Sequence, residues 1–353
     1  MLKVRFWGTR GSIPVALTAA QVRDKVAAVL RESRVRPLQD DAAIEAYLDS
    51  LPFHAAGTYG GHSACVEIDT GGPEYVLCDL GSGVRAFGQA AMARHGPGAP
   101  QTYHVFMSHL HWDHIMGLPF FTPAYIPGNR LIIYGCHAQL REAFVRQQAE
   151  PSFPVDFSVL GAHIEFVQLT PGVPRQVAGL TVTAKQQLHA GDSYGYRFEQ
   201  QAEPRLEQST AQAGGQEGGQ GDGQGREPPG AAHGAVKRVV YSTDSEHKLE
   251  DVTHTQGFVD FFRDADLVVF DAMYSLADAI SVKEDWGHSS NIVGVELCQM
   301  ANVRHLCMFH HEPAFDDAAI ARVLADTRRF EEITRSSTPL RVTAAYDGLV
   351  IEL

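Results

Sequence analysis

The segment "MSHLHWDHIMGLPFF", residues 107–121, places three histidines and an aspartate within six consecutive positions. His109 and His111 alternate by two, and Asp113 and His114 follow where a turn or helix begins. The run "YHVFM" before them reads as an apolar strand, so the polar cluster lies in a loop at the carboxyl end of that strand. Neutral imidazole nitrogens and a carboxylate are the ligands that Zn²⁺ and other first-row divalent metals prefer. We therefore predict a metal-binding loop, because four desolvated polar groups would otherwise need many hydrogen-bond partners.

Three further polar residues stand in matching places, each at the end of a strand-like run. His189 follows "LTVTAKQQL", Asp244 ends "KRVVYSTD", and His310, with His311 beside it, ends "HLCMFHH". Any one of them alone would more often be an ordinary core or surface residue. Four strand ends that all close on His or Asp are hard to explain as four ordinary core or surface residues. They predict one site assembled from several strands.

The order of the elements favours two packed sheets with helices outside over a doubly wound parallel sheet. Strands are predicted at 2–7, 64–69, 74–80, 102–109, 130–135, 163–169, 180–188, 193–199, 237–243, 266–272 and 305–310, and helices at 18–34, 41–50, 137–149, 288–301 and 315–332. We expect a single domain over 1–353 with two additions: a helical insertion at 15–57, which would act as a lid or a dimer contact, and a surface loop at 200–235. That loop has no Leu, Ile, Val or aromatic residue between Leu206 and Val236, and we predict that it is disordered.

Composition narrows the class of protein. The 353 residues are 44% hydrophobic, which allows a sizeable core, and the net charge of −13 disfavours a protein that binds nucleic acid by broad phosphate neutralisation. The five cysteines form no CxxC pair, and no apolar run is long enough to span a membrane. The N-terminal stretch carries charges and does not read as a signal peptide. We therefore expect a cytoplasmic protein with reduced cysteines.

At this point the motifs carry a family resemblance. The pattern His109-Leu-His111-Trp-Asp113-His114, together with "YGGHSACVEI", "LCDLGSG", "YSTD", "WGHSS" and "FHHEP", resembles the metallo-β-lactamase-fold hydrolases. It is most similar to the phosphodiesterase branch, which includes ribonuclease Z and the cyclic-nucleotide phosphodiesterase-like proteins. The resemblance implies an α+β fold, a four-layer αβ/βα sandwich with helices outside two packed sheets.

The resemblance also implies a ligand set for two divalent metal ions. One ion would be held by His109, His111 and His189, the second by Asp113, His114 and His310, and Asp244 would bridge them. His310 is preferred over His311 because it follows the strand directly. Zinc fits the histidine-rich set, and Mn²⁺ or Fe would also be accepted. Two cations lower the pKa of a bridging water, and the resulting hydroxide would attack phosphorus, oriented by Asp113.

A phosphodiester also needs a proton for its departing alkoxide. In the ribonuclease Z pattern a strand-end acid polarises a histidine in an "HST"-like sequence, and here Asp271 and His288 occupy those places. We expect His288 to be the general acid and Asp271 to orient it. The alternatives are that His288 caps the helix that follows and that Asp271 is a plain strand-end acid. Asp79 in "LCDLGSG" is expected to support the site or to form a turn, rather than to take part in catalysis.

The predicted function is a dimetal phosphodiesterase that acts on a small or cyclic nucleotide, with no membrane partner and, by resemblance, as a homodimer. A ribonuclease Z-like tRNA 3′-end endonuclease is the nearest alternative, although no separate basic tRNA-binding arm is evident. Hydrolysis of a β-lactam or thioester is a more distant option. A non-catalytic nucleotide-binding regulatory protein is the alternative from another class, and the intact set of seven ligand candidates disfavours it.

Overall fold

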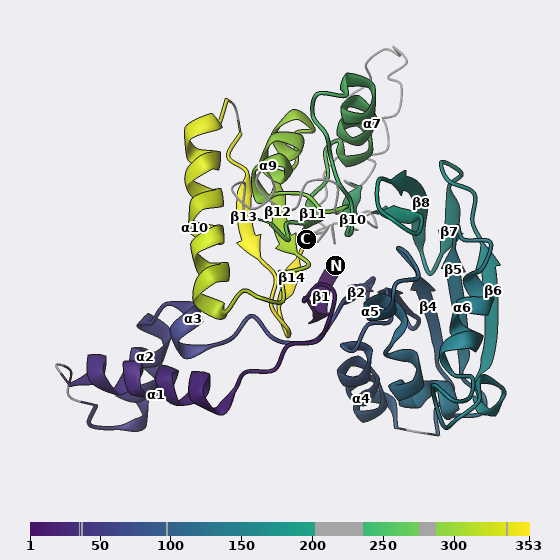
Figure 1. Ribbon diagram of the computed structural model, residues 1–353, viewed down its shortest axis with the longest axis horizontal. Helices are drawn as coiled ribbons and strands as arrows, with labels where there is room; N and C mark the ends of the chain where they lie inside the picture. The colour runs from purple at the N-terminus through teal and green to yellow at the C-terminus, as the bar shows by residue number, and fades with distance from the viewer. Residues whose placement is uncertain (35, 37, 97, 202–235, 275–286, 337) are drawn as a thin grey trace, which may run out of the picture.

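The computed structural model arranges the chain as two β-sheets that pack face to face, with helices on their outer sides (Figure 1). The structure describes residues 1–353 except 35, 37, 97, 202–235, 275–286 and 337. Beyond Gln200 and Gln201, the loop predicted at 200–235 therefore lies outside the described residues. The predicted α+β sandwich is confirmed.

Within the described residues each sheet has seven strands. The first sheet runs in the order β14 (Val350–Glu352), β1 (Lys3–Gly8), β2 (Cys65–Asp69), β3 (Tyr75–Cys78), β4 (Thr102–Phe106), β5 (Arg130–Gly135) and β6 (His163–Gln168). The second runs in the order β13 (Arg341–Ala344), β12 (His305–Phe309), β11 (Leu267–Asp271), β10 (Lys237–Ser242), β9 (Ser193–Gln200), β8 (Leu180–Gln187) and β7 (Arg175–Val177).

The helices follow from amphipathic patterns and local caps. They are α1 (Ala19–Ser33), α2 (Asp41–Ser50), α3 (Phe53–Ala56), α4 (Val84–His95), α5 (Trp112–Ile115), α6 (Leu140–Gln147), α7 (Val252–Phe262), α9 (Asn291–Met300) and α10 (Asp317–Thr334), with 3₁₀ turns η1 (Leu118–Phe120), η2 (Thr122–Tyr125) and η3 (Phe157–Val159). None of the helices in the described part of the chain is long and apolar enough to cross a membrane.

Parallel pairing brings several strand ends to one edge of the sandwich. β3, β4, β5 and β6 are parallel in the first sheet, and β10, β11, β12 and β13 are parallel in the second. Every residue of β11 and β12 is buried, because helices cover one face and the other sheet covers the other. Residues that follow these strands therefore meet at a common edge.

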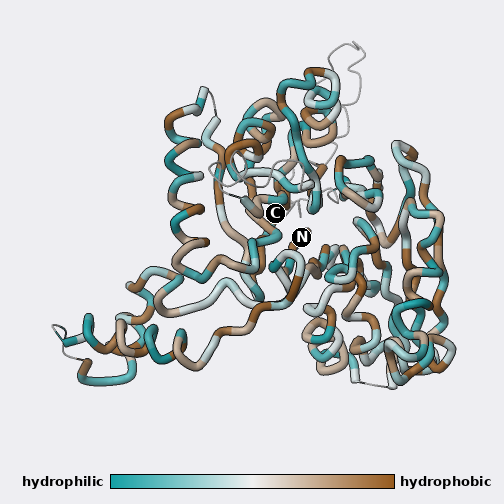
Figure 2. The backbone as a smooth tube through the Cα atoms, viewed as in Figure 1, coloured by the Kyte–Doolittle hydropathy of each residue, from teal (hydrophilic) through white to brown (hydrophobic). Residues whose placement is uncertain are grey.

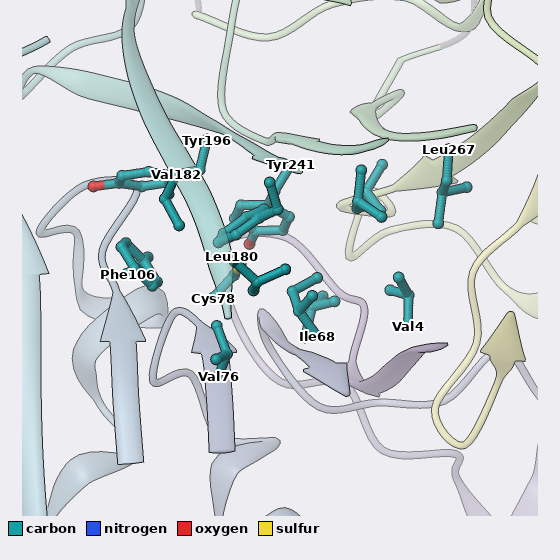
Figure 3. Packing of buried hydrophobic residues seen from close by; sticks show 14 of the residues in the cluster. Val4, Ile68, Val76, Cys78, Phe106, Leu180, Val182, Tyr196, Tyr241 and Leu267 are labelled. Carbon is teal, nitrogen blue, oxygen red and sulfur yellow. The ribbon is translucent and has the colours of Figure 1, made fainter. Parts of the chain in front are cut away.

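The main core lies between the sheets. Figure 3 shows Val4, Ile68 and Val76 from the first sheet packing towards residues of the second, which include Leu180, Val182, Tyr196, Tyr241 and Leu267. Two outer cores join each sheet to its own helices: α7, α9 and α10 cover the second sheet, and α4 and α6 cover the first. The sandwich thus holds the strand ends by packing on both faces of each sheet.

The segment 15–57 contains α1, α2 and α3, and the first two helices project away from the sandwich (Figure 1). No residue of α1 is buried, and apolar and polar residues alternate along the pair in Figure 2. Lys25 joins α1 to the start of α10 through an ion pair of 2.6 Å with Asp317. That this segment acts as a lid or a dimer contact stays a prediction.

Candidate metal centre

The loop after β4 presents its polar side chains through a single helical turn. His111 precedes α5 with extended backbone, and the amide of His114 donates to the carbonyl oxygen of His111 over 3.1 Å. The turn buries Asp113 and His114 and leaves His111 exposed at the opening of the site. One short loop therefore directs four side chains to the same edge of the sandwich.

The predicted ligands come together in space. Among the seven predicted ligands, three groups have one ligand atom of each member within 4.8 Å of the others: His109, His111 and His189; Asp113, His114 and His310; and His109, His114 and Asp244. Asp244 belongs to the last group and also lies 3.2 Å from Nε2 of His310. The structure thus collects all seven predicted ligands, from four strand ends, around one buried point.

Polar atoms of the cluster lie close to one another. Nε2 of His189 lies 3.2 Å from Nδ1 of His111, and Nε2 of His114 lies 3.2 Å from an oxygen of Asp113 and 3.3 Å from one of Asp244. The buried atoms Nε2 of His109, Nε2 of His114, Nε2 of His310 and Oδ2 of Asp113 have no hydrogen-bond partner. Burial of so many unpaired polar atoms is costly unless a cation binds them. The residues therefore fit a divalent metal centre.

The charges of the cluster support cation binding. Burial and the nearby ring of His114 hold the pKa of His109 well below its usual range, which favours the neutral imidazole that coordinates metal. Burial also opposes the charged form of His114, but Asp113, Asp244 and Asp79 outweigh it and raise the pKa of that imidazole well above its usual value. Carboxylates thus dominate the local field, and the site attracts positive charge.

Hydrogen bonds behind the cluster fix the tautomers of its rings. Nδ1 of His114 donates to Asp79 over 2.8 Å, and the same carboxylate accepts from the hydroxyls of Ser108 and Tyr241, each over 2.7 Å. Nδ1 of His189 donates to the carbonyl oxygen of Gly287 over 2.7 Å. Because Nδ1 carries the proton in both rings, Nε2 is free to coordinate a metal. Asp79 therefore has the supporting place that the sequence indicated.

The two adjacent histidines at the end of β12 have different environments. His310 points into the cluster, whereas Nε2 of His311 donates to the carbonyl oxygen of Ala345 over 2.8 Å. Gly11 lies against His310, and a Cβ there would come within 2.6 Å of its ring. The geometry thus brings His310 to the site and assigns His311 to bracing the backbone.

His288 and Asp271 form a buried pair beside the cluster. Nδ1 of His288 donates to Asp271 over 2.8 Å, and the His288 ring stacks on His310 at 5.1 Å between centroids. Burial disfavours the imidazolium, but the Asp271 carboxylate outweighs burial and raises the pKa of His288 to about 9. The pair has the geometry predicted from the sequence, with the proton-bearing ring next to the ligands.

The structure adds supporting residues that the sequence did not single out. The Ser289 hydroxyl donates to the carbonyl oxygen of Ser245 over 2.5 Å, and the amide of Ser245 donates to Asp271 over 3.2 Å. These bonds tie the segment that carries His288 to the segment after Asp244. A serine on either side of a strand end is too common to stand out in a sequence, and no pattern of residues would have found them.

Other residues near the motifs have structural roles. Tyr196 is fully buried and donates from its hydroxyl to the carbonyl oxygen of Met107 over 2.7 Å, and Phe121 is in the core. The Ser63 hydroxyl donates to the carbonyl oxygen of Asp113 over 2.8 Å, which supports the metal loop from behind. Trp112 and Phe120 differ from these, because their side chains are 73% and 56% exposed.

Comparisons with known proteins agree with this fold. Residues 74–209 match the beta-lactamase superfamily domain. Ribonuclease Z of Listeria monocytogenes is 25% identical over 250 residues, which cover 67% of this chain and 79% of the relative. The metallo-beta-lactamase fold protein YhfI from Bacillus subtilis superposes with a TM-score of 0.57 at 16% identity, over 99% of this chain and 98% of that one. Unliganded yeast PDE1 gives a TM-score of 0.56 at 12% identity, over 100% and 99% of the two chains.

Both solved structures share the fold over nearly the whole length of this chain, and the domain match spans the metal loop and His189. Together with the ribonuclease Z relatives, these matches confirm the resemblance read from the motifs. The chain has the metallo-β-lactamase fold, and it is similar in sequence to ribonuclease Z.

Proposed function

We propose that this chain is a metal-dependent hydrolase that cleaves the phosphodiester bond of a small or cyclic nucleotide. The observation that carries the proposal is the His and Asp cluster, in which several buried ligand atoms converge without hydrogen-bond partners and which adjoins the His288–Asp271 pair. A site for cations next to a proton donor fits cleavage of an anionic ester with a basic leaving group.

The residues would hold two divalent ions. His109, His111 and His189 would bind one, Asp113, His114 and His310 the other, and Asp244 would bridge them. Five imidazoles, three of them buried, favour zinc, and the mixed His and Asp set also accepts Mn²⁺ or Fe. When bound, the ions would supply positive charge that activates water for attack and stabilises negative charge on the phosphoryl oxygens.

The protein's own groups complete the reaction. Asp113, which lies buried on α5, would orient the attacking water, and His288, which is bonded to Asp271, would donate a proton to the departing alkoxide. Because Nδ1 of His288 is bonded to Asp271, Nε2 is the nitrogen that would give up the proton. Asp271 also accepts hydrogen bonds from the backbone amides of Ser245 and Met273, and these bonds hold its carboxylate in place. We assign His288 as the general acid and Asp271 as the residue that orients it.

A small nucleotide is favoured as substrate by the overall charge. A net charge of −13 opposes the binding of a long polyanion by broad phosphate contacts, whereas bound metal ions would locally attract one small phosphodiester. The likeness to ribonuclease Z favours a second candidate, cleavage of precursor tRNA. The two candidates differ in substrate size and share the same site chemistry.

A substrate screen with metal-loaded protein tests the proposal. We expect turnover of bis(p-nitrophenyl) phosphate and of a cyclic nucleotide or dinucleotide, and little cleavage of precursor tRNA. Asp244→Asn should remove both turnover and bound metal, measured by elemental analysis, whereas exposed His163→Ala should keep both. A dimetal-loaded sample that cleaves no phosphodiester would refute the proposal, and preferential cleavage of precursor tRNA would select the second candidate.

The homodimer and the cytoplasmic location expected from the sequence are part of this proposal. Light scattering on the purified full chain tests the first. Fractionation of cells that express the tagged chain tests the second.

A further inference from the structure

A groove of about 420 Å³ lies between the metal loop and α6. One wall comes from α5 and η1 with Trp112, Ile115 and Phe120, and the other from α6 and the turn after it, with Gln147 and Phe153. We call it the Trp112 groove. Its volume falls in the range of sites for small organic ligands, which is about 300–1,000 Å³, rather than of protein docking surfaces.

Two aromatic rings in the Trp112 groove face solvent. Trp112 is 73% exposed and Phe120 is 56% exposed, although their neighbours Ile115 and Phe121 are buried. The fold thus packs the apolar residues on either side and leaves these two rings uncovered. Large exposed aromatic side chains grouped in a hollow are typical of ligand sites, since aromatic faces bind planar groups by stacking.

The walls of the groove are held in place. Phe153 packs edge-on against Phe120, with 5.7 Å between ring centroids, and the amide side chain of Gln147 donates to the carbonyl oxygen of Ile115 over 3.1 Å. The second contact joins α6 directly to α5. A ring entering the groove would therefore meet preformed surfaces, which lowers the ordering cost of binding.

The groove and the candidate metal centre share the helix α5. Trp112 stands between His111 and Asp113 in the chain, and α5 directs Asp113 inward to the cluster while Trp112 stays exposed. His111 itself is exposed at the opening of the site. The same short helix thus carries a candidate metal ligand on its buried side and a residue of the Trp112 groove on its exposed side.

From this placement we infer that the Trp112 groove is the subsite for a nucleobase of the phosphodiester substrate, with Trp112 and Phe120 as the stacking residues. The inference rests on the proposed function. It adds a binding site for the base of the substrate, which the metal centre would not contact. Stacking tolerates every base, so the subsite selects a nucleoside ester over a simple alkyl ester without selecting one base.

Two substrates that share a leaving group test the inference: thymidine 5′-(p-nitrophenyl phosphate) and methyl p-nitrophenyl phosphate. For Trp112→Ala and for Phe120→Ala, we expect the preference for the thymidine ester in kcat/KM to fall about 5- to 150-fold, the range for stacking of one base on one ring. The loss should lie mainly in KM. Trp112→Phe should retain most of the preference, and Ile333→Ala, at an exposed apolar residue of α10, should retain all of it.

Binding of thymidine 5′-monophosphate and methyl phosphate, measured by calorimetry, gives a readout independent of turnover. Trp112→Ala should weaken binding of the thymidine compound more than binding of methyl phosphate. Equal losses for both ligands, or no loss, would overturn the inference. A change of oligomeric state in Trp112→Ala by light scattering would also overturn it, because a second copy of the chain would then cover the groove.

The experiments distinguish a failure of the proposed function from a failure of the nucleobase subsite. If the wild-type protein cleaves neither ester, the proposed function is wrong. The calorimetric comparison then still decides whether the Trp112 groove binds the thymidine group.

Discussion

Replacing His288 by alanine separates proton donation from metal binding. The His288 ring stacks on His310 at 5.1 Å, but its own Nδ1 is committed to Asp271 over 2.8 Å. None of the seven predicted ligands donates a hydrogen bond to it in the described contacts, so its removal should leave the ligand set in place. We therefore expect His288→Ala to keep its metal and to lose the proton donor.

The expected loss depends on the leaving group. Through Asp271 the pKa of His288 is raised to about 9, so the imidazolium form is favoured at pH 7. Bound cations would lower this pKa towards the working pH, because they repel the imidazolium. General acid catalysis contributes about 10²–10⁴-fold, or roughly 3–5 kcal/mol of the barrier, to departure of a basic alkoxide. A nitrophenolate needs no proton to leave, so its release should slow less than about tenfold.

The assay compares thymidylyl-thymidine, which releases an alkoxide, with thymidine 5′-(p-nitrophenyl phosphate), which releases a nitrophenolate. His288→Ala should lower kcat much more on the first than on the second, with unchanged metal content by elemental analysis. Exposed His163→Ala controls for the loss of any histidine. Equal losses on both substrates would refute the assignment, and loss of metal would show that His288 supports the ligands instead.

Three further changes test the support of the site and of the fold. Asp79→Asn keeps a residue type that tolerates the left-handed backbone at this position but removes the carboxylate that accepts from His114. Metal affinity, measured by competition with a chelator, should weaken about 10- to 100-fold. Gly11→Ala would place a Cβ within 2.6 Å of the His310 ring, so metal content and activity should fall, whereas Gly98→Ala, with nothing within 4 Å, should keep both. Burial lowers the pKa of His247 in the folded protein to about 3. As the pH falls below about 6.5, the unfolded chain therefore binds a proton at His247 while the folded chain does not. The free energy of unfolding of the wild-type protein should drop by about 2 kcal/mol from this group between pH 7 and pH 5. His247→Phe should lose correspondingly less in urea unfolding at the two pH values, and an unchanged pH dependence would contradict that reasoning.

The sequence predicted the strands that carry the site because they are long, apolar and separated by clear turns. The predicted strand at 130–135 coincides with β5, and that at 180–188 is one residue longer than β8. Strands β7, β13 and β14 were missed, since each has only three or four residues and no periodicity can be read from so few.

Helix α4 was missed for a tertiary reason. Its sequence contains Gly88, which weakens the helical pattern, yet a Cβ at that position would lie 2.9 Å from the ring of Phe121. The close approach of the helix to Phe121 requires glycine, and packing outweighs its low helix propensity. Such a requirement is visible only when the partner across the interface is known.

Within the site, residue type and position predicted the ligands, while the supporting contacts depended on three dimensions. The four strand ends that close on His or Asp were readable because each break from apolar to polar is abrupt. The Ser245 and Ser289 bonds and the exposed face of Trp112 carry no such signal. They arise from segments far apart in the sequence, or from which side of a helix faces solvent.

Backbone conformation explains why the strand-end pattern was informative. Asp79, Asp244 and His310 follow β3, β10 and β12, and their φ angles are +61°, +50° and +59°. A left-handed residue other than glycine costs about 1–3 kcal/mol when the fold forces it, and Asp and His tolerate it better than branched residues do. Glycine would relieve this strain but would bring no ligand. The chain therefore turns sharply at each strand end while keeping a side chain aimed at the shared edge, and the buried parallel strands supply the stability that holds these three turns in place.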